Sequence, residues 1–598
     1  MNWQNKRLRN IYIIDNMSTW EVLKLDGYHQ YFDLVLTYDL ELYKYIESSG
    51  GSVEYFDHLV DTDTMENNNY RIYDYFGKWN LDKNGKDLLC HKGVDFGFSF
   101  RLEFWNDYIS FVRLFLSSVF IKNLDFNKLY LCGNSQIESI FEEIGVDFIP
   151  IVCGSKIQDG FYFPIEKWLD QAIRPNGHRR ILLKTREIVV RLFGYAKIVQ
   201  KKLSSLNKSM VFYQSYHPTF DLINLAISQG KHEVLLENFT KNGPIINKLK
   251  QHTVPILNKT DGLKALADKL MLEVEKGVCH QLNVKYNNEE YDITDFVNQL
   301  IFKRVDQALE NKLRLLESSI SYLSLNPVNL IVLTANIGSL PTIFHLVCKS
   351  KGIPSYMIIN GLMISNYLDE AKYATYINSY STSIKENYFK GIKGVVALGD
   401  PRMDLYQVSE MKEINRLTPT IVIGASGFDS IDLNSYTAVE FDFMYDICKA
   451  IEGFDSAVKI IIKVRPNGYK NQYVDFIDKY FSDLDVNIID KQPMKKVLGK
   501  ADLYISIYSQ TLFEASCMGI PVIYYKKDTQ VLNAPFDGHS ELVTVCDITS
   551  LMLALNDFQK GHIRFDAFLD RAVMQKYVGP LDGKNLQRNM NFIYTKLK

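Results

Sequence analysis

The stretch A-D-L-Y-I-S-I-Y-S-Q-T-L-F-E-A-S-C-M-G-I-P-V-I-Y-Y, residues 501–525, decides the predicted fold. Its apolar run Leu503–Ser506 predicts a buried strand, and a polar loop follows that strand. The next residues have the pattern of a helix, and Gly519 fits a tight turn into a second buried strand, Pro521–Tyr525. A strand, a loop, a helix and a strand in this order indicate a parallel βαβ unit, so the fold class is α/β.

The loop after the first of these strands carries groups that suit a nucleotide. Ser509, Gln510 and Thr511 fall where the strand ends and the helix begins. Free backbone N–H groups and the helix dipole bind phosphate oxygens at such places. Glu514 lies one turn into the helix and can accept hydrogen bonds from a ribose diol. An ordinary βαβ unit explains Gly519 and Pro521, but it does not account for Ser509, Thr511 and Glu514 together.

The pattern S-x-x-x-x-E-A-x-x-x-G-I-P-V-I in this stretch resembles the donor-nucleotide motif of GT-B glycosyltransferases. The segment before it, Pro493–Ser506, resembles the part in which such enzymes place a helix ahead of the donor-site strand. The runs G-I-P-S-Y-M-I-I-N-G, Gly352–Gly361, and V-A-L-G-D-P-R-M-D, Val396–Asp404, resemble segments of the CDP-glycerol transferase-like and capsule Kdo-transferase-like families. The resemblance implies two Rossmann-like halves that face a cleft, and sugar transfer from a nucleotide-activated donor.

Two further loops of the predicted donor half carry candidate phosphate ligands. The run I-I-I-K-V-R-P-N-G-Y-K, residues 460–470, ends a predicted strand with Lys463 and Arg465. In sialyl-, Kdo- and CDP-glycerol-type transferases this segment carries a histidine motif that contacts donor phosphate, and Arg465 stands where that histidine would be. Arginine is a permanently charged, bidentate phosphate ligand, so binding is preserved in principle. The small-residue loop with Gly424 and Ser426 would let a diphosphate approach the backbone.

A transferase that inverts the anomeric carbon needs a base for the acceptor hydroxyl. His217, in a Tyr-His-Pro turn after a predicted strand, is the first candidate because imidazole changes its charge near neutral pH. A purely structural His-Pro turn is the alternative, and Asp221, Glu237 and Asp400 are carboxylate alternatives. The nearest D-x-D sequence, residues 61–63, lies far from these loops. We therefore expect no metal, with the leaving phosphate stabilised by a helix dipole and Arg or Lys.

Composition and periodicity divide the 598 residues into several units. We expect an N-terminal α/β domain at 1–155, a basic helical connector at 156–208, an acceptor-side half at 209–404 with a helical insertion at 240–325, a linker at 405–419 and a donor-nucleotide half at 420–598. The first domain carries no motif with an assignable chemistry, and we expect it to aid acceptor recognition or assembly.

Charge and composition limit the partners and the compartment. The chain has 68 Lys and Arg against 70 Asp and Glu, a net charge of -2, so no basic field points to nucleic acid. The eight cysteines form no C-x-x-C pair, which is typical of buried thiols in a reducing compartment and not of a disulfide framework or zinc site. No signal peptide or membrane-spanning run is evident, and the connector is basic and amphipathic. We expect a cytoplasmic protein. If the connector binds anionic lipid, the protein would be peripheral at the inner face of the membrane. The alternative for the connector is a solvated helix that packs on the next domain.

The predicted function is transfer of a sugar to a growing bacterial surface glycan, with a glycan or a lipid-linked acceptor. A CMP-linked ulosonic acid is the favoured donor, with CDP- and UDP-linked donors as further candidates, and no bound cofactor is expected. Two alternatives stay open. Arg465 and Asn360 replace histidines of the related families, which would suit a non-catalytic GT-B-like assembly protein. A UDP-sugar 2-epimerase, which shares the fold, is the other alternative.

Overall fold

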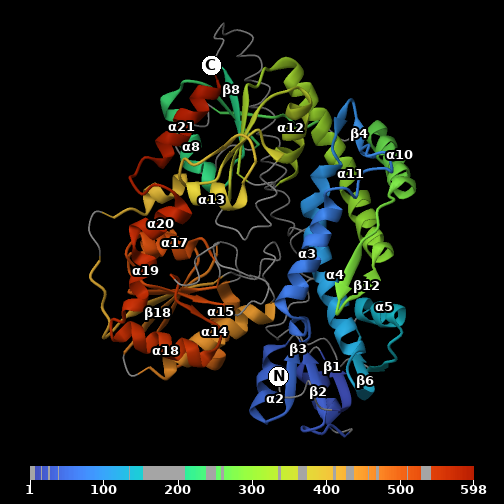
Figure 1. Cartoon of the computed structure of the whole chain (residues 1–598), viewed down its shortest axis with the longest axis vertical. Coiled ribbons are helices and arrows are strands. Elements are labelled where there is room, and N and C mark those ends of the chain that lie inside the picture. Colours follow the sequence, from blue (N-terminus) through green and yellow to red (C-terminus); the bar gives the residue numbers. More distant parts are fainter. Residues whose placement is uncertain are drawn as a thin grey trace.

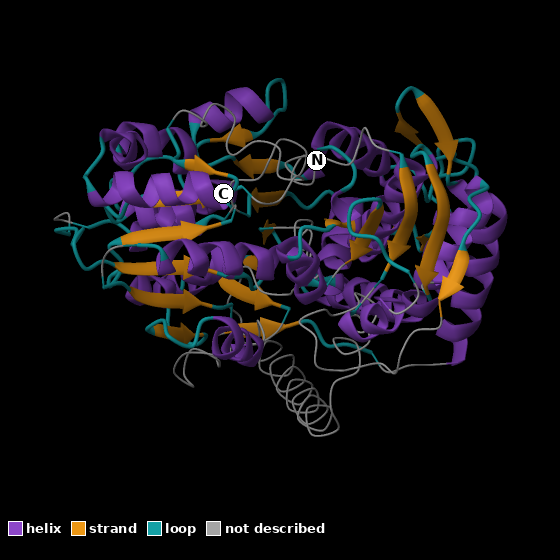
Figure 2. Ribbon diagram, turned by 90° about the horizontal axis from the view of Figure 1, so that it is seen from below, coloured by secondary structure: helices purple, strands orange, loops and turns teal. Residues whose placement is uncertain are grey.

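Three parallel β-sheets organise the chain in the computed structural model, and Figures 1 and 2 show them with the helices that connect and cover their strands. The structure describes residues 7–14, 16–24, 27–37, 39–133, 135–151, 209–237, 251–257, 261–334, 338–360, 373–408, 412–425, 437–454, 457–465, 470–507, 509–526 and 541–597. The predicted basic connector, residues 156–208, and Ser426 lie outside these residues.

The N-terminal sheet has five strands in the order β3-β2-β1-β6-β7, all parallel. They are β1 (Leu8–Ile13), β2 (Asp33–Thr37), β3 (Ser52–Tyr55), β6 (Phe126–Cys132) and β7 (Ile149–Ile151). Its helices are α1 (Met17–Lys24), α2 (Leu40–Ser48), α3 (Thr62–Phe76), α4 (Arg101–Lys122) and α5 (Ser135–Ile144). The strands are rich in Leu, Ile and Val because strands of a covered parallel sheet are buried on both faces.

The second sheet, in the first half of the predicted GT-B unit, has seven parallel strands in the order β10-β9-β8-β13-β14-β15-β16. They are β8 (Met210–Tyr213), β9 (Glu233–Leu236), β10 (Gln251–Thr253), β13 (Leu330–Leu333), β14 (Ser355–Ile358), β15 (Tyr376–Asn378) and β16 (Val395–Val396). Helices α8 (Phe220–Gln229), α12 (Ser339–Ser350) and α13 (Thr382–Tyr388) and the short 3-10 turns η3 (His217–Thr219) and η5 (Pro401–Leu405) follow its strands.

The third sheet, in the second half, has six parallel strands in the order β19-β18-β17-β20-β21-β22. They are β17 (Thr420–Gly424), β18 (Lys459–Lys463), β19 (Val486–Ile489), β20 (Leu503–Ser506), β21 (Val522–Tyr525) and β22 (Thr544–Val545). Its helices include α14 (Thr437–Glu452), α15 (Lys470–Tyr480), α16 (Met494–Leu498), α17 (Thr511–Cys517), α18 (Ile548–Gln559), α19 (Asp566–Leu569), α20 (Arg571–Val578) and α21 (Asn585–Lys596).

Both sheets of the two halves have the strand order of a Rossmann fold, in which the first strand is central and the chain winds outward in both directions. The predicted α/β class with two Rossmann-like halves is confirmed. The predicted apolar strands are present, but the polar edge strand β10, Gln251–Thr253, was not predicted. An edge strand of three residues with polar side chains has no hydrophobic pattern to detect.

The last helix, α21, returns to the first half. The side chain of Asn589 accepts hydrogen bonds from the Tyr356 hydroxyl and, at 2.8 Å, from Asn378 Nδ2, so the helix is fixed against β14 and β15. The Asp404 carboxylate accepts from the backbone N–H groups of Asn585 and Leu586, at 3.1 and 2.8 Å, and caps the helix. The C-terminal segment therefore ties the second half back to the first.

The predicted helical insertion packs both on α4 of the N-terminal unit and on α12 of the first half. It contains α10 (Asp261–Gly277), β11 (Asn283–Tyr286), β12 (Glu289–Asp292) and the 32-residue α11 (Thr294–Leu325). Val297, Ile301 and Val305 of α11 repeat every four residues and share one buried cluster with Phe115 and Leu116 of α4. No helix of the described residues is long and apolar enough to cross a membrane.

Helix α2 of the N-terminal unit docks on the second half, where Figure 1 places it beside α14 and α15. Leu40 is 3% exposed and belongs to the same buried cluster as Phe443 of α14. Lys44 Nζ lies 3.3 Å from the buried carboxylate of Asp442. Lys479 of α15 and Glu41 form a second ion pair, 2.8 Å long and more exposed. The N-terminal unit therefore contacts both halves, one through α11 and one through α2.

We expect the two ion pairs of this contact to differ in their effect on stability. Lys44→Met removes a cation from a carboxylate that is 5% exposed, and we expect the free energy of unfolding to fall by about 1–3 kcal/mol. Lys479→Met breaks the exposed pair, and the loss is expected to stay below about 1 kcal/mol. Urea denaturation of the full chain measures both. Equal losses for the two variants would contradict this difference.

The cysteines only partly follow the expectation of buried, reduced thiols. Cys348, Cys448 and Cys517 are free and buried, Cys90 is free and half-buried, and Cys279 and Cys546 are free but exposed, which corrects the expectation of burial for these two. Cys132, at the end of β6, is disulfide-bonded, so the expectation is wrong for this residue.

Candidate functional site

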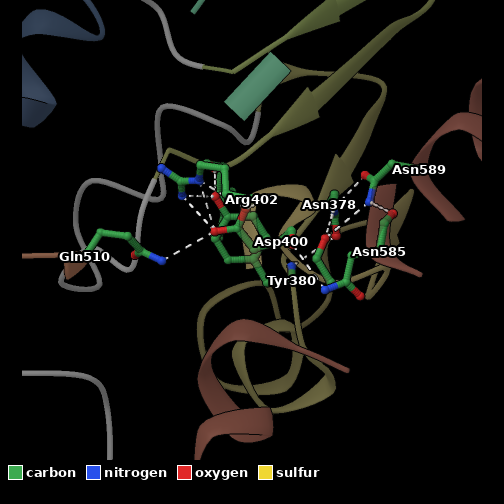
Figure 3. A network of polar contacts seen from close by, with 9 residues as sticks. Asn378, Tyr380, Asp400, Arg402, Gln510, Asn585 and Asn589 are labelled. Carbon is green, nitrogen blue, oxygen red and sulfur yellow. Dashed lines mark hydrogen bonds and ion pairs between the residues drawn. The ribbon is translucent and has the colours of Figure 1, made fainter. Parts of the chain in front are cut away.

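A buried polar network joins the two halves at the carboxyl ends of their sheets (Figure 3). Asp400, which follows β16 of the first half, is fully buried. Its carboxylate accepts hydrogen bonds from Arg402 Nη2 at 2.8 Å and from Arg402 Nε at 3.1 Å to each oxygen. Gln510, from the loop after β20 of the second half, donates to the same carboxylate at 3.3 Å. The predicted donor loop is therefore in direct contact with the first half.

Arg402 is held rigidly in this network. Its Nη2 also donates to the Tyr380 hydroxyl at 3.0 Å. Burial alone would lower the pKa of Arg402, but the adjacent Asp400 carboxylate and Tyr380 outweigh it and raise the pKa. The guanidinium stays charged, and Asp400 is an ion-pair partner. Both Asp400 oxygens accept hydrogen bonds from Arg402. Asp400, which the sequence offered as an alternative base, therefore holds the Arg402 guanidinium in place.

Glu514, the predicted ribose ligand, lies beside this ion pair. It is 7% exposed and its carboxylate accepts a hydrogen bond from the side chain of Tyr406. Burial raises the pKa of Glu514, and the Arg402 charge and the Tyr406 hydroxyl act against that rise. Arg402, Tyr380 and Tyr406 were not predicted as site residues. Arg402 lies in the G-D-P-R-M-D run, which resembles a segment of related families but gave no role to the arginine itself.

The loop after β20 starts α17 at Thr511, as predicted. Thr511 Oγ1 hydrogen-bonds the hydroxyl of Tyr504 and, at 2.9 Å, that of Ser509. The Thr511 backbone N–H donates to Ser509 Oγ at 3.3 Å. Ser509, Gln510 and Thr511 all remain partly exposed. These hydroxyls form a chain that starts in the core at Tyr504 and ends at the loop surface.

Gly424 ends β17 next to β20, and the reason for its small size differs from the predicted one. A Cβ atom at this position would lie 1.9 Å from the hydroxyl oxygen of Tyr504. The residue is therefore required by a tyrosine of the neighbouring strand, whereas the sequence interpretation attributed it to a diphosphate. Gly424 still lies at the second half's topological switch point, where β17 and β20 are neighbours and their following segments diverge.

Lys463 and Arg465 follow β18 but take different positions. Lys463 Nζ donates to the backbone carbonyls of Val464 and Asp490, at 2.7 and 2.9 Å, and burial lowers its pKa. It ties the ends of β18 and β19, so its ammonium group donates to main-chain carbonyls, whereas the sequence predicted that it binds donor phosphate. Arg465 is exposed. Burial raises the pKa of Tyr504 to about 12, and the charge of Arg465 acts against it, which places Arg465 near the Tyr504 hydroxyl.

The remaining candidate bases lie around the first half's sheet. His217 begins η3 after β8, and its side chain is outside the described residues. Asp221 lies in the first turn of α8, and burial raises its pKa. Glu237 follows β9, and burial raises its pKa to about 7. The part of the chain that the structure describes holds no group of three or more His, Cys, Asp or Glu placed for a metal, and Asp61 caps α3 through Thr64.

The two Rossmann-like sheets, the returning C-terminal helix and the polar junction define an α/β protein with the arrangement expected of the GT-B fold. No protein-family model and no curated protein matches the sequence.

Three solved structures that match the chain are distant in sequence. A putative UDP-N-acetylglucosamine 2-epimerase from Listeria monocytogenes has a TM-score of 0.42 at 11% identity, covering 66% of this chain and 97% of that one. MurG from Acinetobacter baumannii has a TM-score of 0.35 at 14% identity, covering 65% and 99%. The calicheamicin glycosyltransferase CalG4 has a TM-score of 0.39 at 10% identity, covering 66% and 99%. At these TM-scores the similarity carries no argument about function.

Proposed function

We propose that this chain is a glycosyltransferase that moves a sugar from a nucleotide-activated donor to a growing bacterial surface glycan. The observation that carries the proposal is the junction of Gln510 with Asp400 and Arg402. It brings the carboxyl-end loop of one Rossmann-like sheet to the carboxyl-end loop of another. Ligands of open α/β sheets bind at such ends, so a donor on one side and an acceptor on the other would meet there.

The donor site that we propose lies on the second half. Ser509 and Thr511 present hydroxyls beside the backbone of the β20 loop, and Arg465 supplies an exposed permanent charge near them. Glu514 is the proposed acceptor of ribose hydrogen bonds, with Tyr406 fixing its orientation. A CMP-linked ulosonic acid is the favoured donor class. The acceptor would be a glycan, carried on a lipid at the inner face of the membrane if the basic connector binds that surface.

Isothermal titration with CMP, CDP and UDP tests this donor site. We expect one of the three to bind with a dissociation constant below millimolar. Arg465→Ala removes the charge proposed for phosphate, and Glu514→Gln removes the carboxylate proposed for ribose. Each is expected to weaken binding at least about tenfold, or 1.4 kcal/mol. Glu452→Gln, on the far end of α14, is the matched control and should bind as wild type does. Binding of none of the nucleotides would refute the proposal.

The reaction type needs a second measurement. Release of free nucleotide from a CMP-, CDP- or UDP-linked sugar, lost in Arg465→Ala, supports a transferase. Conversion of UDP-N-acetylglucosamine to its 2-epimer supports the epimerase alternative, and tight nucleotide binding without turnover supports an assembly protein.

A further inference from the structure

Glu237 lies at the topological switch point of the first half. Strands β8 and β13 are neighbours in the centre of this sheet, and their following segments diverge. The Glu237 carboxylate hydrogen-bonds one of these segments and lies near the other: Oε1 accepts from the backbone N–H of Ser215 at 3.3 Å, after β8. Its Oε2 lies 4.0 Å from where a Cβ of Gly338 would stand, after β13. Open α/β sheets bind ligands at this place.

The charge surroundings of Glu237 are unusual for a half-buried acid. In the described part of the chain, neither an ion pair nor a nearby charged group acts on it, and the Ser215 N–H donates a hydrogen bond to it. Partial burial without a cation disfavours the charged form of a carboxylate, and acids perturbed in this way are concentrated at functional sites. Gly338, with φ +88°, is the N-cap residue of α12 and carries no side chain that could cover the Oε2 face.

We infer that Glu237 is the general base that activates the acceptor hydroxyl, an inference that rests on the proposed glycosyltransferase function. The carboxylate takes the hydroxyl proton while that oxygen forms a bond to the anomeric carbon of the donor. The bond from the anomeric carbon to the phosphate oxygen breaks, and its electron pair leaves with the nucleotide. With burial raising its pKa to about 7, about half of the Glu237 carboxyl groups are ionised near pH 7, and the ionised form is basic enough to take a proton.

The test compares wild type, Glu237→Gln and a matched control by the release of free nucleotide. The probes are CMP-N-acetylneuraminate and UDP-N-acetylglucosamine, with water as the acceptor. We expect the wild-type rate to rise with pH to a plateau above about pH 7, and Glu237→Gln to lose at least about 100-fold in rate with unchanged donor affinity. Glu233→Gln, the same change at the other end of β9, should keep the wild-type profile. A Glu237→Gln rate equal to that of wild type would overturn the inference.

The pH dependence of stability tests the environment of Glu237 without measuring turnover, because a pKa that differs between the folded and unfolded chain makes stability depend on pH. The folded chain binds the Glu237 proton more tightly than the unfolded chain, where the carboxyl has its ordinary pKa of 4.5. The stability that this proton contributes is complete below the unfolded pKa and is lost as the pH rises through about 7. The thermal midpoint of wild type should therefore fall more between about pH 5 and about pH 8 than that of Glu237→Gln. Identical pH profiles would show that the carboxyl is not buried as described, and the inference would fail with it. If wild type turns over no donor, the proposed function fails instead.

Discussion

Arg402→Met is expected to lower the free energy of unfolding by about 3–5 kcal/mol, because it leaves the Asp400 carboxylate buried without its cation. Asp400 is fully buried, and Arg402 donates to both of its oxygens. The side chain of methionine fills similar space but cannot donate a hydrogen bond. Equilibrium unfolding in urea of the full chain measures the loss. Because Gln510 of the donor loop donates to the same carboxylate, the variant should also weaken nucleotide binding.

A double variant separates the charge from the packing. Asp400→Asn/Arg402→Met removes both charges, so we expect it to be more stable than Arg402→Met alone. Arg402→Lys keeps a cation but cannot reproduce the two-sided contact with the carboxylate and should recover only part of the loss. If Arg402→Met cost less than about 1 kcal/mol, Asp400 would not be the buried, charge-paired acceptor for Gln510 that the geometry indicates.

Gly579→Ala is expected to be comparably disruptive, at about 3–5 kcal/mol, since two penalties add. Gly579 ends α20 with φ +84° and ψ -165°, a backbone conformation almost restricted to glycine. A Cβ atom there would lie 2.4 Å from the backbone oxygen of Tyr380 and 2.6 Å from the Cα atom of Gly399. These are main-chain atoms of the first half, so no side chain can turn away to make room.

The matched control for Gly579→Ala is Gly583→Ala. Gly583 also has a positive φ, +71°, but its nearest neighbour to an added Cβ is a side-chain oxygen of Gln407 at 3.7 Å. We expect this variant to cost only about 1–2 kcal/mol, the penalty of the backbone conformation alone. Thermal and urea unfolding of the two variants compare them directly. Similar costs would mean that the close approach of the two halves at Gly579 adds nothing.

Residue patterns predict the position of the loops and helices of the candidate site, but not the partners of their side chains. Thr511 begins a helix after a buried strand as predicted, because the apolar run and the polar loop are local features. Lys463 lies at the predicted strand end, but its ammonium group points to the carbonyls of Val464 and Asp490. The atoms that a lysine at the end of a strand contacts belong in part to the neighbouring strand. The sequence around the lysine therefore does not predict them.

The α/β class, the strands and the location of the polar loops were determined by the sequence itself, because the burial of parallel strands imposes long apolar runs and turns impose small or polar residues. The tertiary structure alone decided three things. It decided that α11 packs against α4, that α2 docks on α14, and that Arg402, Asp400 and Gln510 meet. The physical reason is that a helix's apolar stripe specifies burial but not its partner. Likewise, Asp400 and Gln510 are 110 positions apart, so their contact produces no periodic pattern in the sequence.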